Sequence, residues 1–161
     1  MYQTIRSLLQ SHDLEAISGA VASALERSDE APLWKQKTLP CVRAILSVLL
    51  PLREQGLLFD PEGKPHRDLT SELFLRWCDL LSLKTLAFTL AKSNAEGMLV
   101  RTRHSSDQTA GYRPVDLEEL GKYLASYSVN LEDEWLDFPI TNYNLHIGIT
   151  SLIAKILEGK H

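Results

Sequence analysis

Hydrophobic residues recur along this chain at intervals of three and four, the spacing that places them on one face of an α-helix. The segment 13–27 shows this most plainly, because Leu14, Ile17, Val21 and Leu25 form a single stripe. Comparable stripes predict helices over 1–10, 33–56, 69–77, 82–92 and 145–158, and another helix that Pro114 and Asp116 open. The pattern therefore predicts an all-α fold, a compact bundle of about seven helices.

The segment 33–56 is the most apolar, and we expect it to lie at the centre of the bundle. Its Leu, Val and Ile residues cover more than half of a helix circumference, which is typical of a helix surrounded by others. Pro40 and Pro51 each remove a backbone donor, so we expect them to bend or divide this helix. Gly56 is the predicted C-terminal cap.

Short polar residues predict where other helices begin, because their side chains can accept a hydrogen bond from the first turn. The candidate caps are Ser11 or Asp13, Thr70 or Ser71, and Ser82. His146 precedes the last apolar run and is expected to be a capping or partly buried side chain.

The size and composition of the chain are those of one globular domain, which we assign to 1–161. The chain has 161 residues, of which 44% are hydrophobic and 24% charged, and its net charge of −4 gives no global reason to expect nucleic-acid binding. Cys41 and Cys78 lie in apolar runs, so we interpret both as buried thiols in a reducing compartment. The sequence has no signal peptide and no run of the roughly 18 apolar residues that a membrane span needs.

Motifs for common chemistries are missing from the sequence. Gly121-Lys122 and Gly159-Lys160 lack the earlier glycine and the following Ser or Thr of a phosphate-binding loop. The histidines do not pair at helix spacing and no CxxC occurs, so we expect no metal and no other cofactor. The acids of 116–119 fall in a helical first turn, where they complement the helix dipole. We therefore do not expect this chain to be an enzyme on its own.

The polar loop 93–113 is a candidate contact surface. It carries Arg101, Arg103, His104 and Arg113 among Ser, Thr and Tyr residues. Such a loop suits contacts with DNA phosphates or with an acidic partner, and the alternative is a solvated loop without a partner.

The irregular stretch 128–144 is a second candidate, because it combines acids with aromatic anchors. That combination suits an interface with a basic protein partner, and the alternative is that its aromatic residues fix a long connection to the core. The candidate partner-binding residues are Glu132, Asp133, Glu134, Trp135, Asp137 and Phe138.

Several short runs also follow one another in a specific order. Trp34 opens the leucine-rich helix, which ends in Leu52-Arg53-Glu54-Gln55-Gly56, and Leu80-Leu81-Ser82-Leu83 opens a later helix. The run from Leu117 to Leu124 then leads to the acidic stretch and the last apolar helix. This order resembles the all-α domain of type IV coupling proteins, the hexameric ATPases of conjugation and type IV secretion, over about residues 20–157.

The resemblance implies a domain excised from a larger ATPase, in which it is inserted into a RecA-like motor that carries the Walker motifs. It implies a cytoplasmic location at the inner face of the bacterial inner membrane, reached through the parent protein and without membrane insertion of this domain. The implied partners are a relaxase, a relaxosome component or a secreted effector, with DNA as a further candidate, and the isolated domain is expected to be a monomer. The loop 93–113 and the tail after Tyr127 depart from the family pattern, so no partner residue is transferred.

Two other functions compete with this interpretation. One is a free-standing cytosolic helical adaptor or chaperone-like protein, and Walker motifs beside this segment in its reading frame would exclude it. The other is a small enzyme with an unrecognised site, which a deep pocket holding acids of perturbed pKa would favour.

If the basic loop contacts DNA, replacing Arg101, Arg103 and Arg113 together with Ala will weaken DNA binding and flatten its dependence on salt. Each lost phosphate contact removes counterion release, so the slope of log K against log salt falls with the number of contacts. Fluorescence anisotropy with a labelled duplex over a salt series measures both quantities. Unchanged affinity and slope would exclude this role for the loop.

Overall fold

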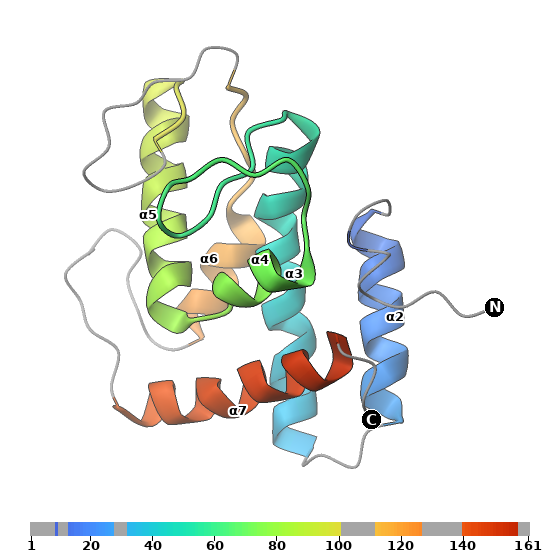
Figure 1. The fold of residues 1–161 in the computed structure, drawn as a ribbon. Coiled ribbons are helices and arrows are strands. Elements are labelled where there is room, and N and C mark those ends of the chain that lie inside the picture. The colour runs from blue at the N-terminus through green and yellow to red at the C-terminus, as the bar shows by residue number, and fades with distance from the viewer. Residues whose placement is uncertain (1–8, 10–12, 28–31, 101–111, 127–139, 158–161) are drawn as a thin grey trace.

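The structure is a computed structural model that describes residues 9, 13–27, 32–100, 112–126 and 140–157, with the side chains of these ranges except 32–35 and 140–145. The described residues contain six helices and no β-strand, so the predicted all-α fold is confirmed (Figure 1). The helix predicted over 1–10 lies, apart from Leu9, outside the described residues. The helices are α2 (Leu14–Glu26), α3 (Pro32–Glu54), α4 (Ser71–Arg76), α5 (Leu80–Glu96), α6 (Glu118–Ala125) and α7 (Ile140–Leu157).

Side-chain caps fix the N-termini of three helices. Asp13 accepts a backbone N–H of the first turn of α2 at 2.9 Å, and Thr70 does the same for α4 at 3.1 Å. Asp13 and Thr70 were each one of two residues predicted as the cap, and both are confirmed. The prediction for α5 was wrong, because the helix begins earlier and its cap is Asp79. The Asp79 carboxylate accepts the N–H of Ser82 at 3.1 Å, so Ser82 lies in the first turn instead of preceding it.

A glycine cap ends α3 where the sequence predicts it. Gly56 has a φ of +71°, a left-handed conformation that glycine adopts without steric cost. The N–H of Gly56 donates to the carbonyl of Arg53 at 3.0 Å, and the N–H of Leu57 donates to that of Leu52 at 2.9 Å. These two bonds form a Schellman motif, which satisfies carbonyls at the helix end.

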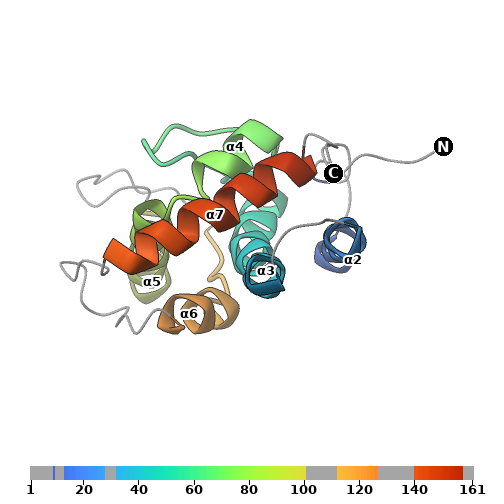
Figure 2. The same ribbon diagram turned by 90° about the horizontal axis from the view of Figure 1, so that it is seen from below.

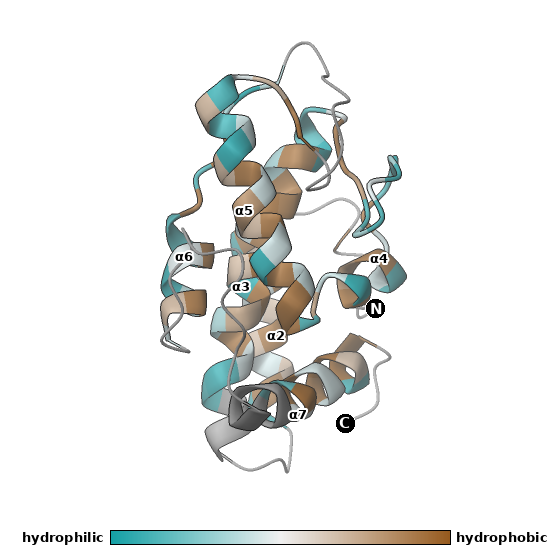
Figure 3. Ribbon diagram, turned by 90° about the vertical axis from the view of Figure 1, so that its left-hand side faces the viewer, coloured by the Kyte–Doolittle hydropathy of each residue, from teal (hydrophilic) through white to brown (hydrophobic). Residues whose placement is uncertain are grey.

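The long helix α3 lies at the centre of the bundle and packs against α2, α6 and α7 (Figures 1 and 2). Its hydrophobic residues run along the helix (Figure 3), and Ile45, Leu46 and Leu49 have no exposed surface. The helix continues through Pro40 and Pro51, so of the predicted bend or division the division is wrong. Each proline costs a backbone hydrogen bond, and burial of the surrounding side chains offsets that cost.

Two other boundaries also differ from the prediction. α5 continues to Glu96 and ends at Gly97, which has a φ of +72°, so the first residues of the predicted loop 93–113 are helical. α7 begins at Ile140, so the end of the predicted irregular stretch 128–144 is helical too. None of the described helices is long and apolar enough to cross a lipid bilayer.

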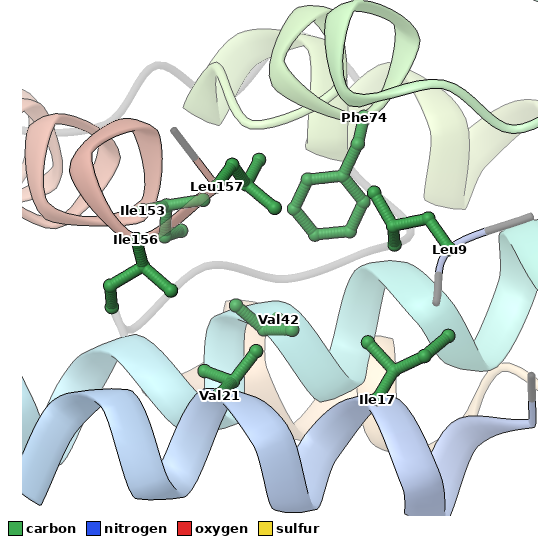
Figure 4. A pocket seen from close by; sticks show the side chains of 8 residues that line it. All are labelled: Leu9, Ile17, Val21, Val42, Phe74, Ile153, Ile156 and Leu157. Atoms are coloured by element: carbon green, nitrogen blue, oxygen red, sulfur yellow. The ribbon is translucent and has the colours of Figure 1, made fainter. Parts of the chain in front are cut away.

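An apolar seam joins α7 to the other end of the chain (Figure 4). Side chains from α2, α3, α4 and α7 converge there around a residual cavity of about 10 Å³, no larger than one water-sized probe occupies. The seam consists of Leu9, Ile17, Val21, Val42, Phe74, Ile153, Ile156 and Leu157.

A buried carboxylate organises the loop between α3 and α4. One oxygen of Asp60 accepts the N–H groups of Glu62 and Lys64 at 2.9 and 3.0 Å, and the other contacts His66 at 2.8 Å and Arg76 at 3.0 Å. Burial raises the pKa of the Asp60 carboxyl, but these hydrogen bonds and the Arg76 charge lower it more, so its pKa is below the ordinary value. The ionised Asp60 thereby holds α4, through Arg76, against the loop.

Replacing Ile153 with Ala will lower the free energy of unfolding by about 2–4 kcal/mol, because it removes buried methyl groups and enlarges the seam cavity. Ile153 is only 2% exposed, whereas Ile147 in the same helix is 63% exposed. Ile147→Ala is therefore the matched control and will change the free energy by less than about 0.5 kcal/mol. Urea unfolding followed by circular dichroism measures both, and equal effects of the two substitutions would contradict this account of the seam.

Candidate interaction surface

A groove of about 410 Å³ runs between α7 and the corner at which α4 passes into α5. The buried residues Ile149, Leu152, Ile153 and Ile156 occupy one arc of α7 and face the core. The groove residues of α7 occupy the neighbouring arc at helical spacing, so the two faces are adjacent. The lining residues are Leu75, Asp79, Leu80, His146, Ile147, Thr150, Ser151 and Ala154.

Ile147 is the apolar edge of this groove. Among the residues whose exposure is described, Leu81 and Ile147 are the large hydrophobic residues left exposed, at 52% and 63%. Single exposed aliphatic residues are common on protein surfaces and need no function. Ile147 differs because it borders a concave surface that also contains Leu75 and Leu80, so an incoming side chain would meet apolar atoms on several sides.

His146 forms the floor of the groove and is 3% exposed, so the expectation of a partly buried side chain understated its burial. Its Nε2 hydrogen-bonds the carbonyl oxygen of Cys78, which only accepts, so Nε2 carries the proton. Its Nδ1 then accepts from the hydroxyl of Tyr123 at 3.2 Å. One imidazole thus ties α7 to α6 and to the α4–α5 corner.

Burial lowers the pKa of His146, and this effect exceeds the opposing influence of the Cys78 carbonyl and the Asp79 charge. The ring is therefore neutral near pH 7, with both nitrogens hydrogen-bonded. The hydroxyl of Thr150 donates to the backbone carbonyl of His146 at 2.9 Å. This arrangement suits a rigid binding surface better than acid–base catalysis, which needs a group poised to exchange a proton with a ligand.

Among the described residues that line the groove, Asp79 is the one with a formal charge. One of its carboxylate oxygens caps α5 through the N–H and hydroxyl of Ser82, at 3.1 and 3.4 Å. The side chain is exposed at the surface, where its second oxygen faces no partner that the structure assigns among the described residues.

A second hollow, of about 450 Å³, lies between the first half of α3 and α6 and contains Lys37, Arg43 and Lys122. Arg43 and Lys122 are already paired with carboxylates. Arg43 contacts both Glu15 and Glu119 at 3.2 Å, and Lys122 contacts Glu118 at 3.0 Å. The hollow is therefore a weaker candidate for an anion than its lysine and arginine content suggests.

Most of the site residues predicted from the sequence cannot be placed. Glu132, Asp133, Glu134, Trp135, Asp137 and Phe138 lie outside the described residues, as do Arg101, Arg103 and His104.

Arg113 is described and exposed. Its N–H donates to the Gln55 side chain at 2.8 Å, and its carbonyl accepts from the same amide at 3.0 Å. The backbone is thus fixed at the end of α3, while the residue as a whole is exposed.

The cysteines are free and buried, as predicted. Burial raises the pKa of Cys41 to about 12, against a lowering by its hydrogen bond with Tyr123, and burial also raises the pKa of Cys78. Neither thiol is therefore a nucleophile at neutral pH. Within the described part of the chain, no three His, Cys, Asp or Glu side chains gather where they could hold a metal ion.

Sequence reasoning missed both Asp79 and Ile147. The available signal was that Ile147 lies off the stripe formed by Ile149, Leu152, Ile153 and Ile156, so a helix buried on that stripe leaves it outside.

Comparison of the chain with protein-family models, with curated proteins and with solved structures found no match.

His146 makes the stability of the fold depend on pH. Its folded pKa lies below the ordinary value of 6.5, so the unfolded chain binds more protons in this range and stability falls as the pH drops below 6.5. The substitution His146→Gln will lower the free energy of unfolding by about 1–2 kcal/mol at pH 7.5 through lost buried hydrogen bonds. It will also remove much of the decline between pH 7 and 5.

Urea unfolding at several pH values tests this expectation. Asp60 does not add to the decline between pH 7 and 5, because the pKa of its carboxyl lies below the ordinary 3.8. Its contribution to the stability of the fold is lost only in stronger acid. A decline of the same size in the wild type and in His146→Gln would show that other groups cause it.

Proposed function

We propose that this chain is a substrate-recruiting helical domain of the type found in type IV coupling ATPases, and that it docks a relaxase, a relaxosome component or a secreted effector. The order of sequence runs that resembles such domains motivates the family, and the all-α fold is consistent with it. The mechanism is docking, in which a few apolar anchors supply affinity and charge steers the encounter.

The groove along α7 is the observation that best supports a binding role. It combines an exposed isoleucine, two leucines and one carboxylate on a surface whose floor is held by His146. A preformed surface of this kind binds without a large ordering cost. The buried cysteines and the neutral, fully bonded His146 leave these groups unsuited to covalent or acid–base chemistry.

Purified relaxases and effectors, each tested with and without DNA, provide the test of this function. We expect the chain to bind at least one of them with a dissociation constant of about micromolar or tighter, as transient recruitment interfaces do. Isothermal titration calorimetry measures the affinity, and an unrelated helical protein of similar net charge is the control. Failure to bind any of these partners, under conditions in which the chain remains folded, would contradict the proposal.

A further inference from the structure

We infer that the groove between α7 and the α4–α5 corner receives a short amphipathic helix of a partner protein, which places an aliphatic side chain against Ile147 and a lysine or arginine beside Asp79. The inference rests on the proposed recruiting function and adds the docking surface and the chemistry of the docked segment.

The shape of the groove favours a helix. Its α7 wall extends from His146 to Ala154, a length of about 12 Å, or about two turns of a helix laid alongside. Thr150, Ser151 and Ala154 are small, so they allow another helix to approach closely. Anchoring side chains spaced by three and four residues are how helices generally occupy such grooves.

The apolar part of the groove sets the anchor. Ile147 is largely exposed, while Leu75 is half-buried and Leu80 is buried on the opposite wall. An aliphatic side chain inserted between these walls removes apolar surface of both partners from water, which is the main favourable contribution to such binding.

The charge of the groove sets the second requirement. A docked helix would exclude water from Asp79, and a carboxylate removed from water without a cation is costly. His146 cannot supply that cation, because it is neutral and both of its nitrogens are bonded within the fold. Of the groove-lining residues that the structure describes, none carries a positive charge, so a lysine or arginine of the docked segment is the cation that balances Asp79.

The experiment is selection from a displayed library of helical peptides of about 15 residues, a length at which helices become stable in isolation. We expect enriched peptides to carry Leu, Ile or Met three or four positions from Lys or Arg. Fluorescence anisotropy then measures their affinity for the wild-type chain and for three variants.

The substitution Ile147→Glu will weaken binding at least about tenfold, because it places a charge against the anchor. Asp79→Ser will weaken it about threefold to tenfold and reduce its dependence on salt, since serine retains the helix cap but not the charge. Leu81→Glu is the matched control, because Leu81 is also exposed but does not line the groove, and it will bind as the wild type does. Circular dichroism checks that all three variants remain folded.

Several results would overturn the inference: no enriched peptide, enrichment without basic residues, or equal losses for Leu81→Glu and Ile147→Glu. A wild-type dimer that Ile147→Glu dissociates, seen by sedimentation velocity, would identify a second copy as the occupant and also overturn it. A relaxase or effector that binds the wild type and Ile147→Glu equally would exclude the groove while leaving the recruiting function in place. Peptide binding at the groove without binding of any relaxase or effector would instead exclude the proposed function.

Discussion

The need to cover α3 on most of its sides determines how the bundle is built. Because its buried residues cover all but one partly exposed stripe, which includes Gln36, Arg43 and Ser47, α2, α6 and α7 all pack against it. α7 crosses the other helices instead of running along them (Figure 2). It therefore buries one arc of its surface against the core, and the neighbouring arc lies beside the α4–α5 corner. The groove is a geometric consequence of that crossing.

Much of this fold can be predicted from the sequence, because helical periodicity and helix caps are local signals. The stripe of 13–27, the caps Asp13 and Thr70 and the glycine end of α3 all follow from interactions within a few residues. The continuity of α3 through its prolines does not, since it depends on packing contributed by distant helices. The early start of α7 likewise has no strong local signal, because 140–144 lacks the hydrophobic stripe of the residues that follow.

The groove could be predicted only in part. That Ile147 lies off the buried stripe is readable from the sequence, but its neighbours are not. His146 meets the Cys78 carbonyl across a sequence separation of 68 residues, and this contact brings Asp79 and Leu80 beside α7. No periodicity encodes such a pairing. The irregular stretch 128–144 was a candidate because of its composition alone. Composition indicates what a surface can bind but not where that surface lies.

Two buried polar groups stabilise opposite walls of the groove. His146 fixes α7 to α6 and to the α4–α5 corner, while Asp60 holds α4 in place through Arg76. The Trp77 indole N–H adds a bond to the carbonyl of Phe59 at 3.0 Å on the same side. Both walls are therefore set by the core before any partner arrives, so a ligand that needs a wider or differently shaped groove must break buried hydrogen bonds. Selectivity for a ligand then follows from the shape of the groove and from the Asp79 carboxylate. Strong acid would loosen both walls, because it protonates His146 and Asp60, which hold them.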